Sequence, residues 1–313
     1  MPQEPPRHPQ VVGLGLCTVD LLFRVPRAPA FGQVVRAASY LRQGGGPVPT
    51  ALVALARLGV STAFISRVGD DEDGRSILAE LAAAGVDVGG VGVEAGATSR
   101  VALVLVDEHT GERGFTAWPE TCRPLAPGDL DRAVIAAARM LHLDDADAPS
   151  LQAARWARQA GVTVVFDGTW GHDDLGELLP LVDVPVVSEP FVAAWMPGTP
   201  PAKVLDRLWE YGPCLAVLTL GSRGCAVRWQ AGTCRFPAFP VEVVDTTGAG
   251  DAFHGGLIYG LLQGWEVERT VTFASAVAAL NCRRLGGRTG LPDLRQVEEF
   301  LARLGPLAPL PVG

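Results

Sequence analysis

The stretch VVDTTGAGDAFHGGLIYGLLQG, Val243–Gly264, joins a short apolar run to a long helical one through a glycine-rich turn. Gly248, Ala249 and Gly250 stand where the helix would begin, so its first N–H groups lack partners and point outward with the positive end of the helix dipole. An anion such as a phosphate group can approach these amides because the residues are small. Asp251 would face the same pocket, as a base that takes a proton from an attacking hydroxyl. The alternative is that Asp251 only complements the dipole.

Composition excludes several classes of partner. The chain has 313 residues, a net charge of −8 and scattered cationic residues, so we expect neither nucleic acid nor a membrane as a partner. The first ten residues, MPQEPPRHPQ, contain no apolar signal segment, which predicts a cytoplasmic protein. Six cysteines and five histidines are dispersed without metal-ligand spacing, so reduced thiols are expected and no zinc site is predicted.

Apolar strand-like runs alternate with helical segments through most of the chain. The helical segments, such as LQAARWARQAG, close on glycines suited to helix C-termini. This rhythm predicts an α/β fold around a mostly parallel sheet. The stretches at about 20–43 and 98–120 interrupt it with further β-like runs, which predict a small β-sheet lid. The strand-like runs are VVGLGL, TAFISRV, RMLHLD, TVVFDG, PVVSE and LAVLTLG.

The spacing D-T-T-G-A-G-D at 245–251 resembles the C-terminal signature of the PfkB, or ribokinase-like, family of sugar kinases. The resemblance covers nearly the whole chain and implies a single kinase domain, 1–313, folded as a three-layer α/β/α sandwich with a lid. It implies transfer of the γ-phosphoryl of ATP to a sugar hydroxyl. In that reading Asp251 is the base, and the amides from Ala249 to Asp251 stabilise charge on the transferring group.

A second signature concerns the sugar. The run GGGPVPTALVALARLG is similar to the family's N-terminal motif, in which a double glycine, here Gly44 and Gly45, lets a sugar approach the backbone. Thr50 stands where many members have an asparagine that bonds a sugar hydroxyl. Asp20 falls where the family places an aspartate that accepts hydrogen bonds from two sugar hydroxyls.

The resemblance also implies a nucleotide site. LTLGSRGCAV is similar to the family's nucleotide loop, with Thr219, Gly221 and Gly224 as the contact residues. The helix that contains Ala278 and Asn281 should lie along the adenine pocket.

Two kinds of cation follow from the same resemblance. The family's N-x-x-E motif reads Ser-Glu-Pro-Phe here, which leaves Glu189 to act on the Mg²⁺ of Mg-ATP through a water. Asp245 and Thr247 match positions that contribute to a monovalent-cation site in some members, so K⁺ is compatible with this chain.

The acceptor and the oligomer are predicted less directly. Several segments look most like the bacterial sulfofructose kinase and ketohexokinase-like group, but Gln33, Ala117 and Asp145 stand where that group has cationic or amide donors. We therefore expect an uncharged, ketose-like sugar. A nucleoside kinase or a non-catalytic sugar-binding regulator stays open as an alternative. The aromatic residues of the lid that would form a nucleoside site are Phe31, Phe115 and Trp118. The lid predicts a homodimer, because exposed strand edges tend to be covered.

Overall fold

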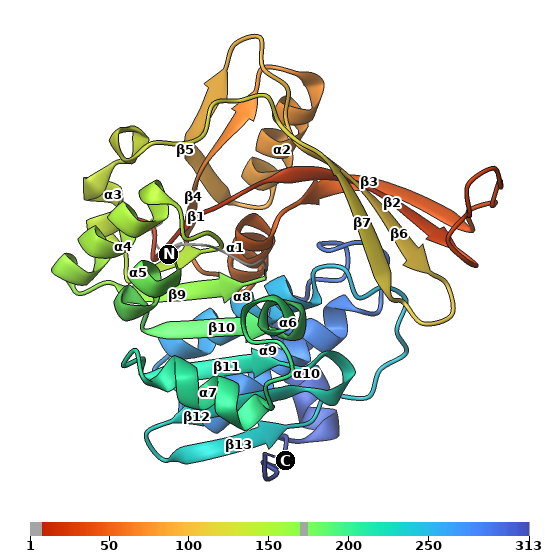
Figure 1. Ribbon diagram of the computed structural model, residues 1–313. Helices are drawn as coiled ribbons and strands as arrows, with labels where there is room; N and C mark the ends of the chain where they lie inside the picture. The colour runs from red at the N-terminus through yellow and green to blue at the C-terminus, as the bar shows by residue number, and fades with distance from the viewer. Residues whose placement is uncertain (1–7, 170–174, 313) are drawn as a thin grey trace.

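The computed structural model describes residues 8–169 and 175–312, within which a nine-stranded sheet forms the centre of the molecule (Figure 1). Its neighbouring strands pair in parallel, apart from the antiparallel pairs that β12 makes with β11 and β13 at one edge. In spatial order the strands are β13 (Gly232–Phe236), β12 (Cys225–Trp229), β11 (Leu215–Thr219), β10 (Val184–Ser188), β9 (Thr163–Gly168), β8 (Met140–Leu143), β1 (Val11–Leu14), β4 (Thr62–Gly69) and β5 (Val86–Glu94).

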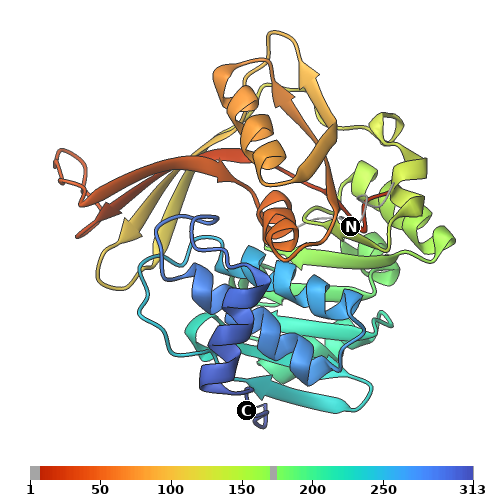
Figure 2. The same ribbon diagram turned by 180° about the vertical axis from the view of Figure 1, so that it is seen from behind.

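Helices cover both faces of this sheet, which gives the predicted three-layer sandwich (Figure 2). The central strands are mainly apolar because both of their faces are buried, although β8 contains His142. One face carries α1 (Pro47–Arg57), α2 (Glu72–Ala83), α8 (Ala249–Leu262), α9 (Val267–Asn281) and α10 (Leu294–Leu304). The other carries α3 (Arg132–Ala137), α4 (Ala148–Ala160), α5 (Leu175–Leu178), α6 (Glu189–Trp195) and α7 (Pro201–Trp209).

The two stretches that interrupt the βαβ rhythm form a separate small sheet. Among the described residues it has four strands in the order β3-β2-β6-β7 and extends beyond the main sheet (Figure 1). The central pair, β2 and β6, is parallel and the outer pairs are antiparallel. Its strands are β2 (Thr18–Val25), β3 (Ser39–Gly45), β6 (Val101–Asp107) and β7 (Arg113–Trp118).

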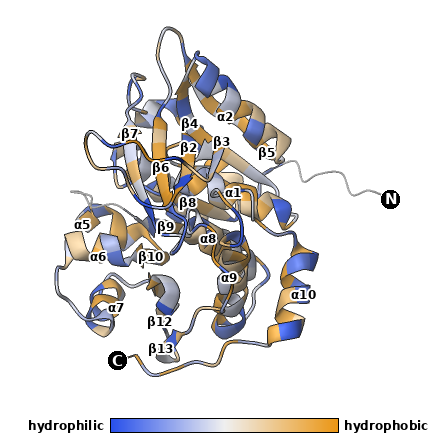
Figure 3. Cartoon of the chain, turned by 90° about the vertical axis from the view of Figure 1, so that its right-hand side faces the viewer, coloured by the Kyte–Doolittle hydropathy of each residue, from blue (hydrophilic) through white to orange (hydrophobic). Residues whose placement is uncertain are grey.

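Local signals explain most helix boundaries. Gly59, Gly85 and Gly161 follow α1, α2 and α4 with φ values of 89°, 88° and 74°, a conformation that glycine adopts without a steric penalty. Polar and apolar residues alternate around α10, as its hydropathy colouring shows (Figure 3), and Asp293 caps its start. Helix α1 begins at Pro47, three residues before Thr50, because proline suits the first helical position.

Some elements were not predicted. Strand β5 has the glycine-rich sequence VDVGGVGVE and lies half exposed at the sheet edge, and the β12–β13 hairpin follows the predicted nucleotide loop. Most of the proline-rich N-terminal stretch, residues 1–7, lies outside the described residues. In the part of the chain that the structure describes, no helix is long and apolar enough to cross a membrane.

Candidate active site

The turn at 245–251 is the start of α8, as predicted. Gly248 precedes the helix with a φ of 71°, and a Cβ there would lie 2.6 Å from the Cα of Gly287. The amide of Ala249 donates to the carbonyl of Thr246 at 3.2 Å, so it is already used. Within the described residues, the amides of Gly250 and Asp251 have no partner. The predicted anion site therefore offers two free amides rather than three. A Cβ on Gly250 would meet no atom within 4 Å, which leaves open space in front of these amides.

Asp251 lies in the first turn of α8 and is half buried. Burial raises the pKa of its carboxyl well above the usual range, and the charge of Asp167 adds to this. Arg113 and Arg288 oppose the shift without cancelling it. Asp251 therefore holds a proton more tightly than a surface aspartate, as a group that receives a proton from a hydroxyl must do.

The residues predicted to contact the sugar lie together where the small sheet meets α1. Asp20 on β2 is 7% exposed, and a Cβ on Gly45 of β3 would lie 2.2 Å from its Oδ2 atom. A side chain at position 45 would therefore displace the carboxylate of Asp20. The hydroxyl of Thr18 donates to Asp20 at 2.5 Å, but burial has the larger effect and raises the pKa of Asp20. Asp20 thus faces the double glycine as a poorly solvated acceptor.

Arg288, a buried cation, lies in the same place and was not predicted from the sequence. Its side chain is 6% exposed, its Nε donates to the hydroxyl of Thr50 at 3.1 Å, and its Nη2 donates to the carbonyl of Gly45 at 2.8 Å. The remaining nitrogen, Nη1, has no hydrogen-bond partner among the described residues and lies 3.9 Å from the carboxylate of Glu80. A Cβ on Gly44 would lie 2.4 Å from Nη1. The guanidinium therefore packs against the double glycine with one donor unused.

Asp144 is a second residue that the sequence analysis missed. It follows β8, is 2% exposed, and neither of its carboxylate oxygens has a hydrogen-bond partner in the described part of the chain. Burial raises its pKa well above the usual range, although the nearby amides of Val48 and Leu16 oppose the shift. Its position at the carboxyl end of a parallel strand, where α/β folds bind ligands, was the available signal.

Asp245, Thr247 and Asn281 join the start of α8 to the loop that follows α9. Asp245 is fully buried and accepts hydrogen bonds from the amide and hydroxyl of Thr247 and from the amide of Gly286, at 2.7 to 2.8 Å. The buried amide of Asn281 donates to the carbonyls of Thr247 and Gly287 at 3.3 and 3.0 Å. Asn281 thus braces the loop, and its contact with adenine stays a prediction.

The predicted nucleotide residues lie at the end of β11 and on α9. Gly224 has a φ of 88°, and a Cβ there would lie 1.9 Å from the carbonyl oxygen of Phe236, so the turn requires glycine. Gly221 has a φ of 56° and faces open space, while Thr219 and Ala278 are partly exposed.

Glu189 stands at the start of α6, where it forms an ion pair with Arg223 of the turn between β11 and β12. Its carboxylate therefore already has a cationic partner, and a water-mediated contact with Mg²⁺ would compete with this ion pair. Glu189, which was predicted to take the place of the N-x-x-E motif, is therefore poorly placed to act on Mg²⁺ in this arrangement.

The arrangement combines a raised-pKa carboxylate and free helix amides with buried polar side chains where the small sheet meets α1, and its sequence has known relatives. Residues 8–294 match the model of the pfkB family of carbohydrate kinases. The chain belongs to the pfkB family. This confirms the family predicted from the D-T-T-G-A-G-D signature.

Individual relatives of this pfkB chain differ in the acceptor that they are named for. An ATP-dependent ribose-1-phosphate kinase from Halopiger xanaduensis is 34% identical, over 94% of this chain and 98% of the relative. Fructokinase-1 from rice, Oryza sativa subsp. japonica, is 29% identical over the same shares. A crystal structure from Agrobacterium tumefaciens, provisionally described as a ribokinase, superposes with a TM-score of 0.85 at 27% identity, covering 95% of this chain and 98% of that one. Membership of the family identifies this chain as a carbohydrate kinase. Its predicted likeness to the sulfofructose kinase group stays a prediction.

Proposed function

We propose that this pfkB kinase transfers the γ-phosphoryl group of Mg-ATP to a primary hydroxyl of an uncharged, ketose-like sugar. The observation that carries the proposal is the raised-pKa carboxylate of Asp251 beside the free amides of Gly250 and Asp251. In the proposed reaction Asp251 takes the hydroxyl proton, the hydroxyl oxygen attacks the γ-phosphorus, and ADP leaves. The amides then stabilise negative charge on the transferring group, which in phosphoryl transfer contributes more than the base does.

The sugar acceptor would be recognised by buried hydrogen-bond acceptors together with one hydrogen-bond donor. Asp20 and Asp144 accept from sugar hydroxyls, and both are buried where water cannot replace a lost partner. Arg288 donates through its unused Nη1 to a sugar oxygen. Thr50 acts through Arg288, because its hydroxyl already accepts from that guanidinium. The carboxylates outnumber the one buried guanidinium, which favours an uncharged sugar.

Mg-ATP would bind along the end of β11 and the face of α9. The backbone at Gly221 and Gly224 would follow the phosphates and ribose, with Thr219, Ala278 and Asn281 nearer the nucleoside. Mg²⁺ supplies charge neutralisation on the β- and γ-phosphates when bound. Among the protein groups, Glu189 would act through water only after its ion pair with Arg223 opens.

A K⁺ ion would bind near Asp245 and Thr247 and order the loop after α9. The support is the buried hydrogen-bond network that ties this loop to the start of α8. Ordering of the loop would then place Gly248 and the free amides for the phosphoryl group.

The small sheet would serve as a lid and as a dimer interface. Tyr40, Leu103 and Trp118 are 55%, 39% and 69% exposed, and the strand register places all three on the face opposite Asp20. Pairing of two lids would bury these side chains in a homodimer. Light scattering with size exclusion should then give a dimer for the wild type and a monomer for Leu103→Glu.

Two other acceptors have specific support. The buried guanidinium of Arg288 suits the phosphate of a sugar phosphate, as the name of the ribose-1-phosphate kinase relative also suggests. A nucleoside is supported by Phe115, which the strand register places on the face of Asp20, whereas Trp118 faces away from it.

The test is an ADP-production assay across fructose, ribose, ribose 1-phosphate and nucleosides. The proposal expects the highest kcat/KM with an uncharged sugar. A kcat/KM at least tenfold higher for ribose 1-phosphate or for a nucleoside would show that the acceptor belongs to that class and not to the uncharged sugars. ATP binding with no acceptor-dependent turnover across the panel would favour a sugar-binding regulator.

A further inference from the structure

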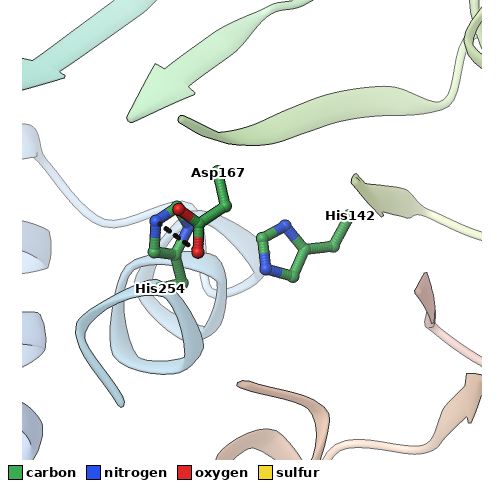
Figure 4. Close-up of side chains that lie close together, drawn as sticks. All are labelled: His142, Asp167 and His254. Carbon is green, nitrogen blue, oxygen red and sulfur yellow. Dashed lines mark ion pairs between the residues drawn. The ribbon is translucent and has the colours of Figure 1, made fainter. Parts of the chain in front are cut away.

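Three buried titratable side chains converge beside α8, outside the residues assigned to the sugar and the nucleotide. His142 comes from β8, Asp167 from β9 and His254 from the first turns of α8 (Figure 4). Their exposed fractions are 0%, 4% and 2%. One potential ligand atom from each residue lies within 4.8 Å of the other two.

The hydrogen bonds of the two imidazoles leave one ring nitrogen of each unused. His142 Nδ1 lies 3.4 Å from the carbonyl of Val165, which can only accept, so Nδ1 carries the hydrogen. In this tautomer Nε2 keeps its lone pair. Nε2 is buried and has no partner within the described residues.

His254 shows the same pattern with the nitrogens exchanged. Its Nε2 lies 3.3 Å from Oδ2 of Asp167, and its buried Nδ1 has no partner in the described part of the chain. Asp167 also accepts a hydrogen bond from the hydroxyl of Thr169 at 2.5 Å.

We propose that His142, Asp167 and His254 form a binding site for a single transition-metal ion of the Zn²⁺ or Co²⁺ type. Imidazoles that bind such metals usually donate their other N–H to a carboxylate or a backbone carbonyl, and His142 does so to the carbonyl of Val165. His254 would bind through Nε2, which already lies 3.3 Å from Oδ2 of Asp167, about the separation of two ligand atoms on one ion. The hydrogen of the His254 ring would then sit on Nδ1. Two nitrogens and a carboxylate oxygen match three-ligand zinc sites, with the fourth position left for water. Mg²⁺ prefers oxygen ligands and would bind poorly here.

The ring arrangement is compatible with one shared ion. The imidazole centroids are 5.0 Å apart with 27° between the ring planes. With metal–nitrogen bonds of about 2.0–2.1 Å, ligand atoms at two corners of a tetrahedron lie about 3.4 Å apart. The present atoms lie within 4.8 Å of one another, so the widest pair must close by up to about 1.4 Å. Small side-chain rotations can supply this movement. The ion would balance Asp167, whose charge acts on both Asp144 and Asp251.

The test measures metal content and the visible spectrum of the full chain. Protein stripped with a chelator is incubated with Co²⁺ or Zn²⁺, and a second sample is refolded in the presence of the ion because the ligands are buried. After gel filtration we expect one equivalent of metal per chain by mass spectrometry, and the d–d absorption of tetrahedral or five-coordinate Co²⁺. Mg²⁺ at the same concentration should leave no retained metal.

The variants His142→Gln, His254→Gln and Asp167→Asn should each weaken Co²⁺ binding by more than about 100-fold, because each removes a direct ligand. His109→Gln is the matched control, since His109 is exposed on the turn between β6 and β7. Wild-type protein that retains no metal after refolding with Co²⁺ or Zn²⁺ overturns the proposal. So does a Co²⁺ spectrum unchanged in the three variants. The wild-type measurement decides the matter even where a variant fails to fold.

Discussion

Replacement of Arg288 by methionine should impair recognition of the acceptor and leave recognition of ATP intact. Methionine keeps a long apolar stem but removes the donors to Thr50 and Gly45 and the unused donor Nη1. A hydrogen bond from a charged donor contributes about 1.5–3 kcal/mol. Loss of one such bond to a sugar oxygen therefore lowers kcat/KM for the acceptor by about 10- to 100-fold.

The same substitution should also lower stability. Two intramolecular hydrogen bonds disappear, but the desolvation of a buried guanidinium is relieved, so we expect a net loss of about 2 kcal/mol. For a chain of 313 residues that corresponds to a melting temperature lower by about 3 °C. Arg42→Met is the matched control, since Arg42 lies on the same strand as Gly45 but pairs with Asp73 at 33% side-chain exposure.

The assay is a coupled measurement of ADP with acceptor and ATP varied independently, below the melting temperature of each variant. The expected result is a raised acceptor KM for Arg288→Met with the ATP KM within about twofold of wild type. An acceptor KM that moves no more than in Arg42→Met would refute the role assigned to Nη1. Equal changes in both KM values would indicate a general structural effect.

Three further perturbations test the start of α8. Gly248→Ala should lower stability by about 1–3 kcal/mol in urea unfolding and reduce turnover, because its φ is 71° and its Cβ would meet Gly287. Asp245→Asn should abolish any stimulation of turnover by KCl over NaCl, since its carboxylate orders the loop through Gly286; full stimulation in the variant would count against the K⁺ proposal. Asp251→Asn should have a higher melting temperature than wild type at pH 8, because folding raises the pKa of the Asp251 carboxyl. The wild-type protein therefore loses stability as pH rises from the unfolded pKa of 3.8 through the folded value, and asparagine avoids this loss. That gain should vanish at or below pH 4, and an equal gain at both pH values would contradict the pKa shift.

Much of the fold follows from the sequence because its signals are local. The buried parallel strands are mainly apolar runs, although β8 contains His142 and β9 contains Asp167. The glycines after α1, α2 and α4 mark positive φ values that other residues adopt poorly. The two interrupting stretches predicted the small sheet because their strand-like runs lack the following helices of βαβ units. Strand β5 was missed because glycine-rich edge strands carry little periodicity.

The site was predictable where one motif holds both the turn and its chemistry, as at Gly248 and Asp251. Arg288 was missed because its partner Thr50 lies 238 positions away, and no local pattern shows that a loop arginine turns inward. His142 and His254 were also unpredictable as a cluster. Only the packing of α8 against the ends of β8 and β9 brings them together, and dispersed histidines have no spacing to identify.

The proposed reaction depends most on Asp251 as the base of phosphoryl transfer. The direct measurement is kcat of Asp251→Asn with the best acceptor of the panel, alongside ATP binding by calorimetry as the control for a folded site. We expect ATP binding to persist and kcat to fall by about 10²–10⁴-fold, the usual effect of losing a positioned base. A variant that binds ATP and turns over within tenfold of wild type, with the same pH dependence, would contradict it.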